Sequence, residues 1–152
     1  MSDGTLQEQV VIQCSQSGNR IILSARQENT WEHGEESSVS ALVTIEAGGL
    51  RAFTEVDFFY SNDTFVSFFE ELARNWKGWD GERSVSSLEC DFKLCATSDR
   101  LGHGTLRVSL HSGGYDGVSC GWRAEAELRL DAWQYAVIAK EMRLFLGAVQ
   151  SR

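Results

Sequence analysis

Asp99 and His103 are the first residues whose types and spacing could do chemistry. They stand at the two ends of the pentapeptide DRLGH, and a carboxylate beside an imidazole is the arrangement of a general acid–base pair. The same spacing is typical of a turn in which the aspartate accepts its own backbone N–H groups and the histidine begins the next strand. We expect the turn and keep the catalytic dyad as the alternative.

The segment WEHGEE, residues 31–36, gathers acidic groups around a histidine and a tryptophan. Carboxylates and imidazole are ligands of many divalent ions, so Glu32, His33, Glu35 and Glu36 could in principle hold a metal. The segment is short and contains a glycine, which favours a solvated acidic loop instead. We therefore expect no metal and no cofactor.

The cysteines and the paired glutamates give no further catalytic group. Cys90 and Cys95 lie five residues apart in one expected strand, so they should face opposite sides of a sheet. Cys90 and Cys120 should both face inward, but no histidine accompanies them as a zinc site requires. Adjacent glutamates at 70 and 71 point about 100° apart on a helix and cannot converge as a glycosidase pair.

The sequence therefore predicts a protein that is not an enzyme. It contains no glycine-rich phosphate loop, no nucleophile elbow and no pair of histidines at helical metal-binding spacing. Its four cysteines, without an export signal, favour reduced thiols rather than a disulfide framework.

Alternation of apolar and polar residues predicts about seven strands, and two segments change to a helical period. Gly48-Gly49 has the form of a tight hairpin between two of the strands. The strands are expected at 8–14, 19–27, 38–47, 50–59, 87–96, 104–112 and 119–131, and the helices at 61–76 and from 131 to about 149.

The first helical segment carries its apolar residues at spacings of four, three and four. Phe65, Phe69, Leu72 and Trp76 would form one buried stripe. We expect Trp76 to be a core anchor. Trp79 lies beyond the helix end and should also be mainly structural, as an apolar contact of the helix terminus.

These elements predict the α+β class, as a single domain over residues 1–152. The architecture expected is a two-layer domain, in which a curved antiparallel sheet of about seven strands is covered on one face by two amphipathic helices. An orthogonal sandwich of two sheets with peripheral helices is the alternative.

The charge of the chain restricts its partners. The formal net charge is −8 over 152 residues, which argues against nucleic-acid phosphates and anionic lipid and favours a cationic partner. No run of 18 apolar residues suggests a membrane span, and the first residues lack the basic start of a signal peptide. We therefore expect a cytoplasmic protein that binds neither nucleic acid nor membrane, as a monomer or homodimer.

Three segments resemble a family of small uncharacterised bacterial proteins that is similar to the WapI-type toxin immunity proteins. They are FVSFFEELARNWKGWDGERSVSSLE, SDRLGHGTLRVSL and GWRAEAELRL, and the resemblance covers roughly residues 38–149. Val85 and Gly104 depart from the pattern, which usually has an aromatic and an apolar residue there. The matching positions are Phe69, Leu72, Ala73, Trp76, Gly78, Trp79, Gly81, Ser87, Leu88, Glu89, Asp99, Gly102, His103 and Trp122.

The resemblance implies an immunity protein that neutralises a cationic toxin domain of a competing bacterium. An acidic surface with an exposed aromatic would be the recognition site, because tryptophan beside carboxylates suits a partner rich in arginine and lysine. A small-molecule-binding protein or enzyme, with a cavity between sheet and helices, is the alternative. The partner-binding residues expected are Trp31, Glu32, Glu35 and Glu36, and, as a second choice, Asp80 and Glu82.

Overall fold

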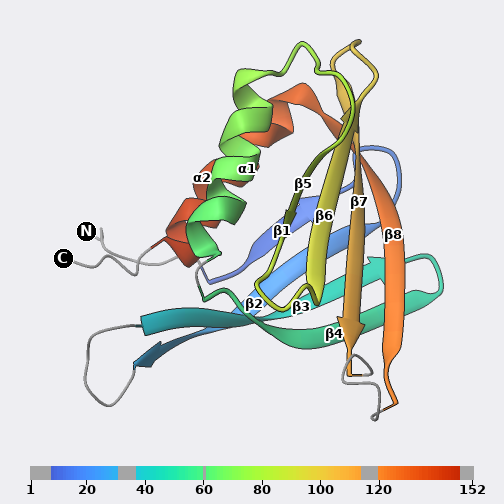
Figure 1. Ribbon diagram of the computed structural model, residues 1–152. Coiled ribbons are helices and arrows are strands. Elements are labelled where there is room, and N and C mark those ends of the chain that lie inside the picture. The colour runs from blue at the N-terminus through green and yellow to red at the C-terminus, as the bar shows by residue number, and fades with distance from the viewer. Residues whose placement is uncertain (1–7, 31–36, 60, 114–119, 148–152) are drawn as a thin grey trace.

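The computed structural model describes residues 8–30, 37–59, 61–113 and 120–147, and it places the strands in two antiparallel sheets (Figure 1). The first sheet has the order β1-β2-β3-β4 and the second has the order β5-β6-β7-β8. The first sheet consists of β1 (Val10–Gln13), β2 (Arg20–Thr30), β3 (Ser37–Ala47) and β4 (Leu50–Asp57). The second consists of β5 (Arg83–Ser86), β6 (Phe92–Ser98), β7 (His103–Ser112) and β8 (Trp122–Asp131).

The α+β class is confirmed, but the expectation of one sheet of about seven strands is wrong. Every strand pairs only with its neighbours in sequence, within one half of the chain or the other. Helix α1 (Asn62–Arg74) separates the halves, so the polypeptide leaves the first sheet at Asp57 and starts a new one at Arg83. Alternation reveals that a strand has one buried face, and it does not reveal which sheet the strand joins.

Both sheets turn their apolar faces toward a shared core, and the helices close its open side. Helix α2 (Ala132–Leu146) contacts β1 and β8, and α1 contacts α2 and β5. In Figure 1 the strands of the second sheet run steeply across those of the first, and the two helices fill the angle between them. Phe58, Phe65 and Phe92, from the segment before α1, from α1 and from β6, pack with ring centroids 5.2 to 6.1 Å apart.

A bulge in β2 fixes one end of α2. Ser24 pairs with Leu42 and Gln27 with Ser40, so two residues of β2 lie opposite one residue of β3. Arg26, in this bulge, donates from Nε to the carbonyl oxygen of Phe145 at 2.5 Å. A cation at the last carbonyls of a helix satisfies an open acceptor and complements the helix dipole.

Of the two tryptophans in the first helix region, only Trp79 has the structural role that the sequence suggested for both. Helix α1 ends at Arg74, so Trp76 lies outside the helical stripe and its side chain is 50% exposed, with Lys77 over its ring. Trp79 is 6% exposed and donates from Nε1 to the carbonyl oxygen of Ala96 at 3.3 Å. The prediction that Trp76 anchors the core is wrong, because the helix ends two residues before it and does not bring its ring inward.

The second helix begins where the sequence placed it. Asp131 is the N-cap residue, and its N–H donates to Oε1 of Gln134 at 2.8 Å. This contact is one half of a capping box, in which a side chain three positions into the helix bonds back to the N-cap residue.

The cysteines are all free, as expected, but two of them face differently from the prediction. Cys90 is exposed and lies in a turn before β6, at a φ of 62°, rather than on a strand. Cys120 is exposed too, whereas Cys14 and Cys95 are buried. The expected inward pair of Cys90 and Cys120 does not form, because both residues lie in connections outside the strands.

Gly104 leaves the space that the Tyr135 side chain occupies, so a larger residue at this position would not improve the packing. A Cβ atom at this position would come within 2.2 Å of the Tyr135 hydroxyl oxygen and 3.0 Å of the Thr97 carbonyl oxygen. Helix α2 therefore approaches β7 closely here, and the apolar residue of the family pattern would not fit.

Among the helices of the described residues, none is long and apolar enough to cross a membrane.

Candidate functional site

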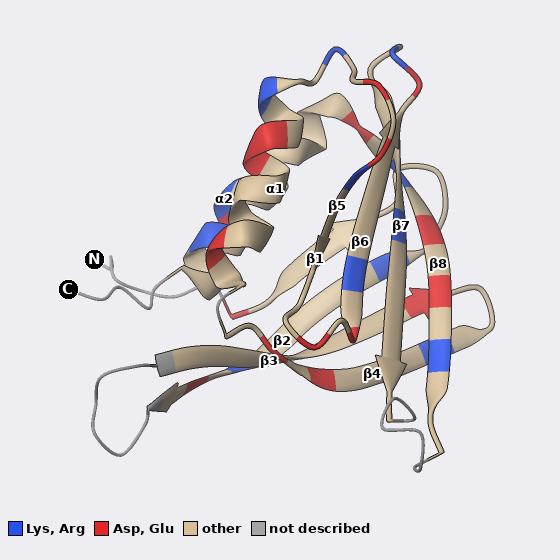
Figure 2. Cartoon of the chain, viewed as in Figure 1, with Lys and Arg blue, Asp and Glu red and all other residues tan. Residues whose placement is uncertain are grey.

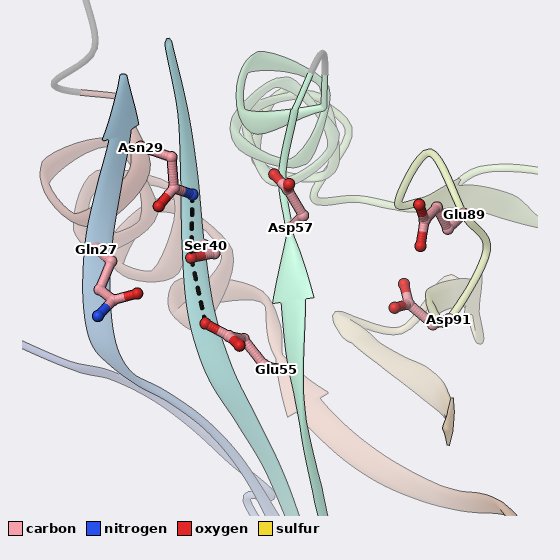
Figure 3. A pocket seen from close by; sticks show the side chains of 7 residues that line it. All are labelled: Gln27, Asn29, Ser40, Glu55, Asp57, Glu89 and Asp91. Carbon is pink, nitrogen blue, oxygen red and sulfur yellow. Dashed lines mark hydrogen bonds between the residues drawn. The ribbon is translucent and has the colours of Figure 1, made fainter. Parts of the chain in front are cut away.

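An open cleft lined only by polar and acidic side chains lies where the two sheets come together (Figure 3). Its volume is about 320 Å³. Strands β2, β3 and β4 supply one wall, and the turn between β5 and β6 supplies the other. We call this site the acidic cleft, and it is lined by Gln27, Asn29, Ser40, Glu55, Asp57, Glu89 and Asp91.

Hydrogen bonds order the wall that the first sheet contributes. Asn29 donates from Nδ2 to the hydroxyl oxygens of Ser38 and Ser40, each at 3.3 Å. The hydroxyl of Ser40 donates in turn to Oε2 of Glu55 at 3.4 Å. Ser40 is only 5% exposed, so this chain of contacts holds the Glu55 carboxylate against a fixed strand rather than leaving it free.

The opposite wall is ordered in the same way. The hydroxyl of Ser87 donates to Oδ1 of Asp91 at 2.5 Å, and its oxygen accepts the N–H of Phe92 at 3.2 Å. Ser87 is 2% exposed, so the turn that presents Glu89 and Asp91 is fixed to the core at β6. The sequence placed these two acids on the face of a strand, but β6 begins only at Phe92.

Within the part of the chain that the structure describes, the four carboxylates of the cleft form no ion pairs. They are Glu55, Asp57, Glu89 and Asp91. Figure 2 shows the acidic turn between β5 and β6, with no basic residue in it. Uncompensated charge of one sign, focused in a hollow, attracts ligands of the opposite sign.

The carboxylates of the cleft are not clustered as the ligands of a metal ion are. Within the described ranges, no three histidine, cysteine, aspartate or glutamate side chains are grouped closely enough to hold a metal ion. The carboxylates are spread along both walls, which suits an extended cationic group better than a small ion.

The four partner-binding residues of first choice, Trp31, Glu32, Glu35 and Glu36, lie outside the described residues. Their segment follows β2 directly, and Asn29 of the cleft is two positions before Trp31.

The residues of second choice, Asp80 and Glu82, are paired with cations. Asp80 forms an ion pair with Arg100, and Oε2 of Glu82 lies 3.4 Å from a guanidinium nitrogen of Arg107. Sequence spacing could not show this, because both arginines come from the second sheet region, at least 20 residues along the chain.

Asp99 and His103 form the turn that the sequence favoured. Oδ1 of Asp99 accepts the N–H groups of Leu101 at 2.7 Å and His103 at 3.1 Å, and His103 is the first residue of β7. Oδ2 contacts Nδ1 of His103 at 3.0 Å and a guanidinium nitrogen of Arg129 at 2.9 Å. The Leu101 N–H is the main cause that lowers the pKa of Asp99.

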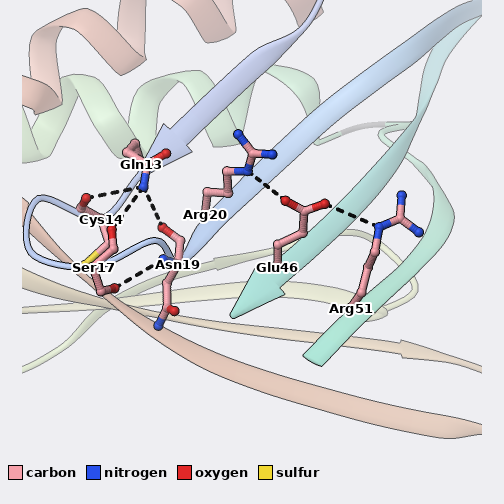
Figure 4. A network of polar contacts seen from close by, with 7 residues as sticks. All are labelled: Gln13, Cys14, Ser17, Asn19, Arg20, Glu46 and Arg51. Atoms are coloured by element: carbon pink, nitrogen blue, oxygen red, sulfur yellow. Dashed lines mark hydrogen bonds and ion pairs between the residues drawn. The ribbon is translucent and has the colours of Figure 1, made fainter. Parts of the chain in front are cut away.

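A second hollow, of about 600 Å³, lies at the opposite end of the first sheet. It is lined by residues of the β1–β2 loop and of the β3–β4 hairpin, among them Glu46 and Arg51. Glu46 lies between two guanidinium groups, at 2.7 Å from Nε of Arg20 and 3.3 Å from Nε of Arg51 (Figure 4). Neither hollow lies between a sheet and the helices, where the small-molecule alternative places its cavity.

The comparisons identify a family and no function. Residues 12–149 match the family of unknown function DUF6228, and the chain therefore belongs to that family. No curated protein matches the chain.

Proposed function

We propose that this member of the DUF6228 family is a non-catalytic binding protein whose acidic cleft takes a basic segment of a protein partner. The observation that carries the proposal is the cleft itself, in which four carboxylates line one hollow without a cation among the described residues. Lysine or arginine side chains of a partner would supply the missing counter-charges.

Two further features support a protein partner over a small cationic molecule. The cleft is open to solvent and its walls come from two sheets, so a projecting loop or strand has access from outside. The net charge of −8 would also steer a basic protein toward the chain before contact and raise the association rate.

The role that fits such a partner best is that of a cytoplasmic immunity protein. Immunity proteins act by occupying a toxin domain, which requires a complementary surface and no chemistry. The resemblance of residues 38–149 to proteins similar to the WapI-type immunity proteins supports this role, and a basic toxin domain would be the partner.

A co-expression experiment tests the proposal. The chain is co-expressed with the toxic domain encoded beside its own gene, and survival of the host is measured. The double variant Asp57→Asn/Glu89→Gln, which removes one carboxylate from each wall, is expected to fold normally and to lose most of the protection.

A charge-matched control separates the cleft from overall charge. Glu125→Gln/Glu127→Gln removes the same two charges from exposed positions on β8 and is expected to protect like the wild type. The association rate of the purified pair should also fall as salt is raised, since the Debye length is about 8 Å at physiological ionic strength. Full protection by the cleft variant would remove the cleft from the interface.

A further inference from the structure

Helix α2 presents an apolar stripe to solvent. Trp133 is 69% exposed, Val137 45% and Leu144 42%, and Lys140 lies on the same stripe because the spacings are four, three and four residues. The inward side of α2 is buried by the core at the same time, through Tyr135, Ile138, Met142 and Phe145. A helix that is apolar on both sides is typical of one covered on both sides.

Helix α1 shows that the exposed stripe is particular to α2. Its outward positions are Asp63, Ser67, Glu71 and Arg74, all polar. Both helices lie on the same side of the molecule and pack against each other (Figure 1). One surface helix therefore has the usual polar outer face and its neighbour does not.

The stripe has the property that an interface between two identical chains needs. Its spacing of four, three and four is the same in either direction along the helix. When a second copy of α2 lies antiparallel against it, Trp133 therefore faces Leu144 of that copy, and Val137 faces Lys140. A two-fold interface requires this self-complementarity, because the same residues meet from both sides.

The charges beside the stripe fit the same arrangement. Lys140 and Glu141 form no ion pair among the described residues. Glu141 follows Val137 by four positions, so a lysine that packs on Val137 of the other copy also reaches Glu141 of that copy. Two equivalent ion pairs would form, one on each side of the two-fold axis. A basic partner would instead meet Lys140 with a like charge.

We propose that two copies of this chain associate through the outer face of α2, with the two helices antiparallel. Helix α2 has 15 residues and is about 22 Å long. A contact between two single helices of this length is small beside the roughly 1,200–2,000 Å² of stable interfaces. We therefore expect a weak dimer, with a dissociation constant on the order of micromolar. No residue of the acidic cleft lies on α2, so this proposal does not depend on the proposed function.

Sedimentation equilibrium of the whole chain, from sub-micromolar to millimolar concentration, tests the proposal. The apparent mass is expected to rise from that of one chain to that of two. Leu144→Glu should weaken the association by at least about tenfold. Leu50→Glu changes the same residue type at a similar exposure, 37%, in the β3–β4 turn and should leave the association unchanged. A wild-type chain that stays at the mass of one copy would overturn the proposal.

An exchange of charges tests the antiparallel arrangement. Lys140→Glu and Glu141→Lys should each weaken the dimer, since each places like charges opposite one another. The double variant Lys140→Glu/Glu141→Lys restores both ion pairs in reverse and should recover the wild-type dissociation constant. If Leu144→Glu associates as tightly as the wild type, α2 is not the interface. If the double charge variant dimerises no more tightly than the single variants, the helices do not pack antiparallel as proposed. Thermal unfolding of each variant controls for loss of fold.

Discussion

The acidic cleft and the opposite end of the second sheet contain carboxylates in similar number, but only one of the two regions neutralises them. At that opposite end Asp80, Glu82 and Asp99 each meet an arginine, and we call this group with its arginines the paired end. In the cleft the four carboxylates have no cation among the described residues. The difference teaches that acidic composition alone does not indicate a binding surface. The positions of the cations decide whether a carboxylate serves the fold or is left for a partner.

The paired end also includes large side chains of the core, whereas the side chains that line the cleft are all polar or acidic. Trp79, one residue before Asp80, is buried and packs with its ring centroid 6.1 Å from that of Tyr135. Gly104, one residue after His103, accommodates the hydroxyl of the same tyrosine. If the comparison is right, changes at the paired end cost stability, and changes in the cleft cost binding without a loss of stability.

The largest expected effect is that of Trp79→Ala. Truncating a buried tryptophan lowers the free energy of unfolding by about 3–5 kcal/mol, and this change also leaves the Ala96 carbonyl oxygen without its indole donor. The matched control is Trp76→Ala, at a half-exposed ring, which should change the stability by less than about 0.5 kcal/mol. Urea unfolding of both variants provides the measurement. Equal losses in the two variants would break the contrast between the tryptophans.

Gly104→Ala should have the next largest effect. The new methyl group would overlap the Tyr135 hydroxyl, so α2 or β7 must shift, and overpacking of this kind costs about 1–3 kcal/mol. The double variant Gly104→Ala/Tyr135→Phe removes the clashing oxygen and should recover part of the loss. Thermal unfolding of both variants measures the loss of stability. If the double variant recovers none of it, the Tyr135 hydroxyl is not the group that excludes a side chain at position 104.

A smaller effect is expected in the acid dependence of stability. The backbone hydrogen bond from Leu101, together with the contacts of His103, lowers the pKa of Asp99 below its ordinary value. A carboxyl group with a lowered folded pKa stabilises the protein at pH values above its unfolded pKa. It loses that contribution as the pH falls through the folded value. Asp99→Asn should therefore flatten the loss of stability between neutral and acid pH. Unfolding curves at several pH values measure this. A variant whose stability falls with pH as steeply as that of the wild type would contradict the prediction.

The smallest expected effects are two changes in stability of different sign, one at a paired carboxylate and one at an unpaired carboxylate. Glu46→Gln removes a carboxylate held between Arg20 and Arg51 and should lower the stability slightly, because two cations lose their partner. Glu89→Gln removes one of four like charges in the cleft and should leave the stability unchanged or raise it. Differential scanning calorimetry at low salt gives both values. A loss at Glu89 as large as that at Glu46 would mean that the cleft carboxylates also serve the fold.

The sequence by itself determined most of the elements, because each depends on local periodicity. Alternation over residues 38–47 and 104–112 marked β3 and β7, and the change to a helical period after residue 131 marked the start of α2. The turn at Asp99 and His103 was also predictable, since its main contacts are with backbone groups within four residues. The side-chain carboxylates Glu55 and Asp57 were visible only as the polar side of a strand.

Tertiary structure alone decided which sheet each strand joined, which tryptophan was buried and which carboxylates were left unpaired. Trp76 continues the helical spacing of the buried residues, but α1 ends before it. The spacing of apolar residues does not determine at which residue a helix ends. The cleft brings together side chains from residue 27 to residue 91, and the arginines that neutralise Asp80 and Glu82 come from distant strands. Charge pairing depends on distances across the fold, and a linear pattern contains no information about those distances until the sheets have been assembled.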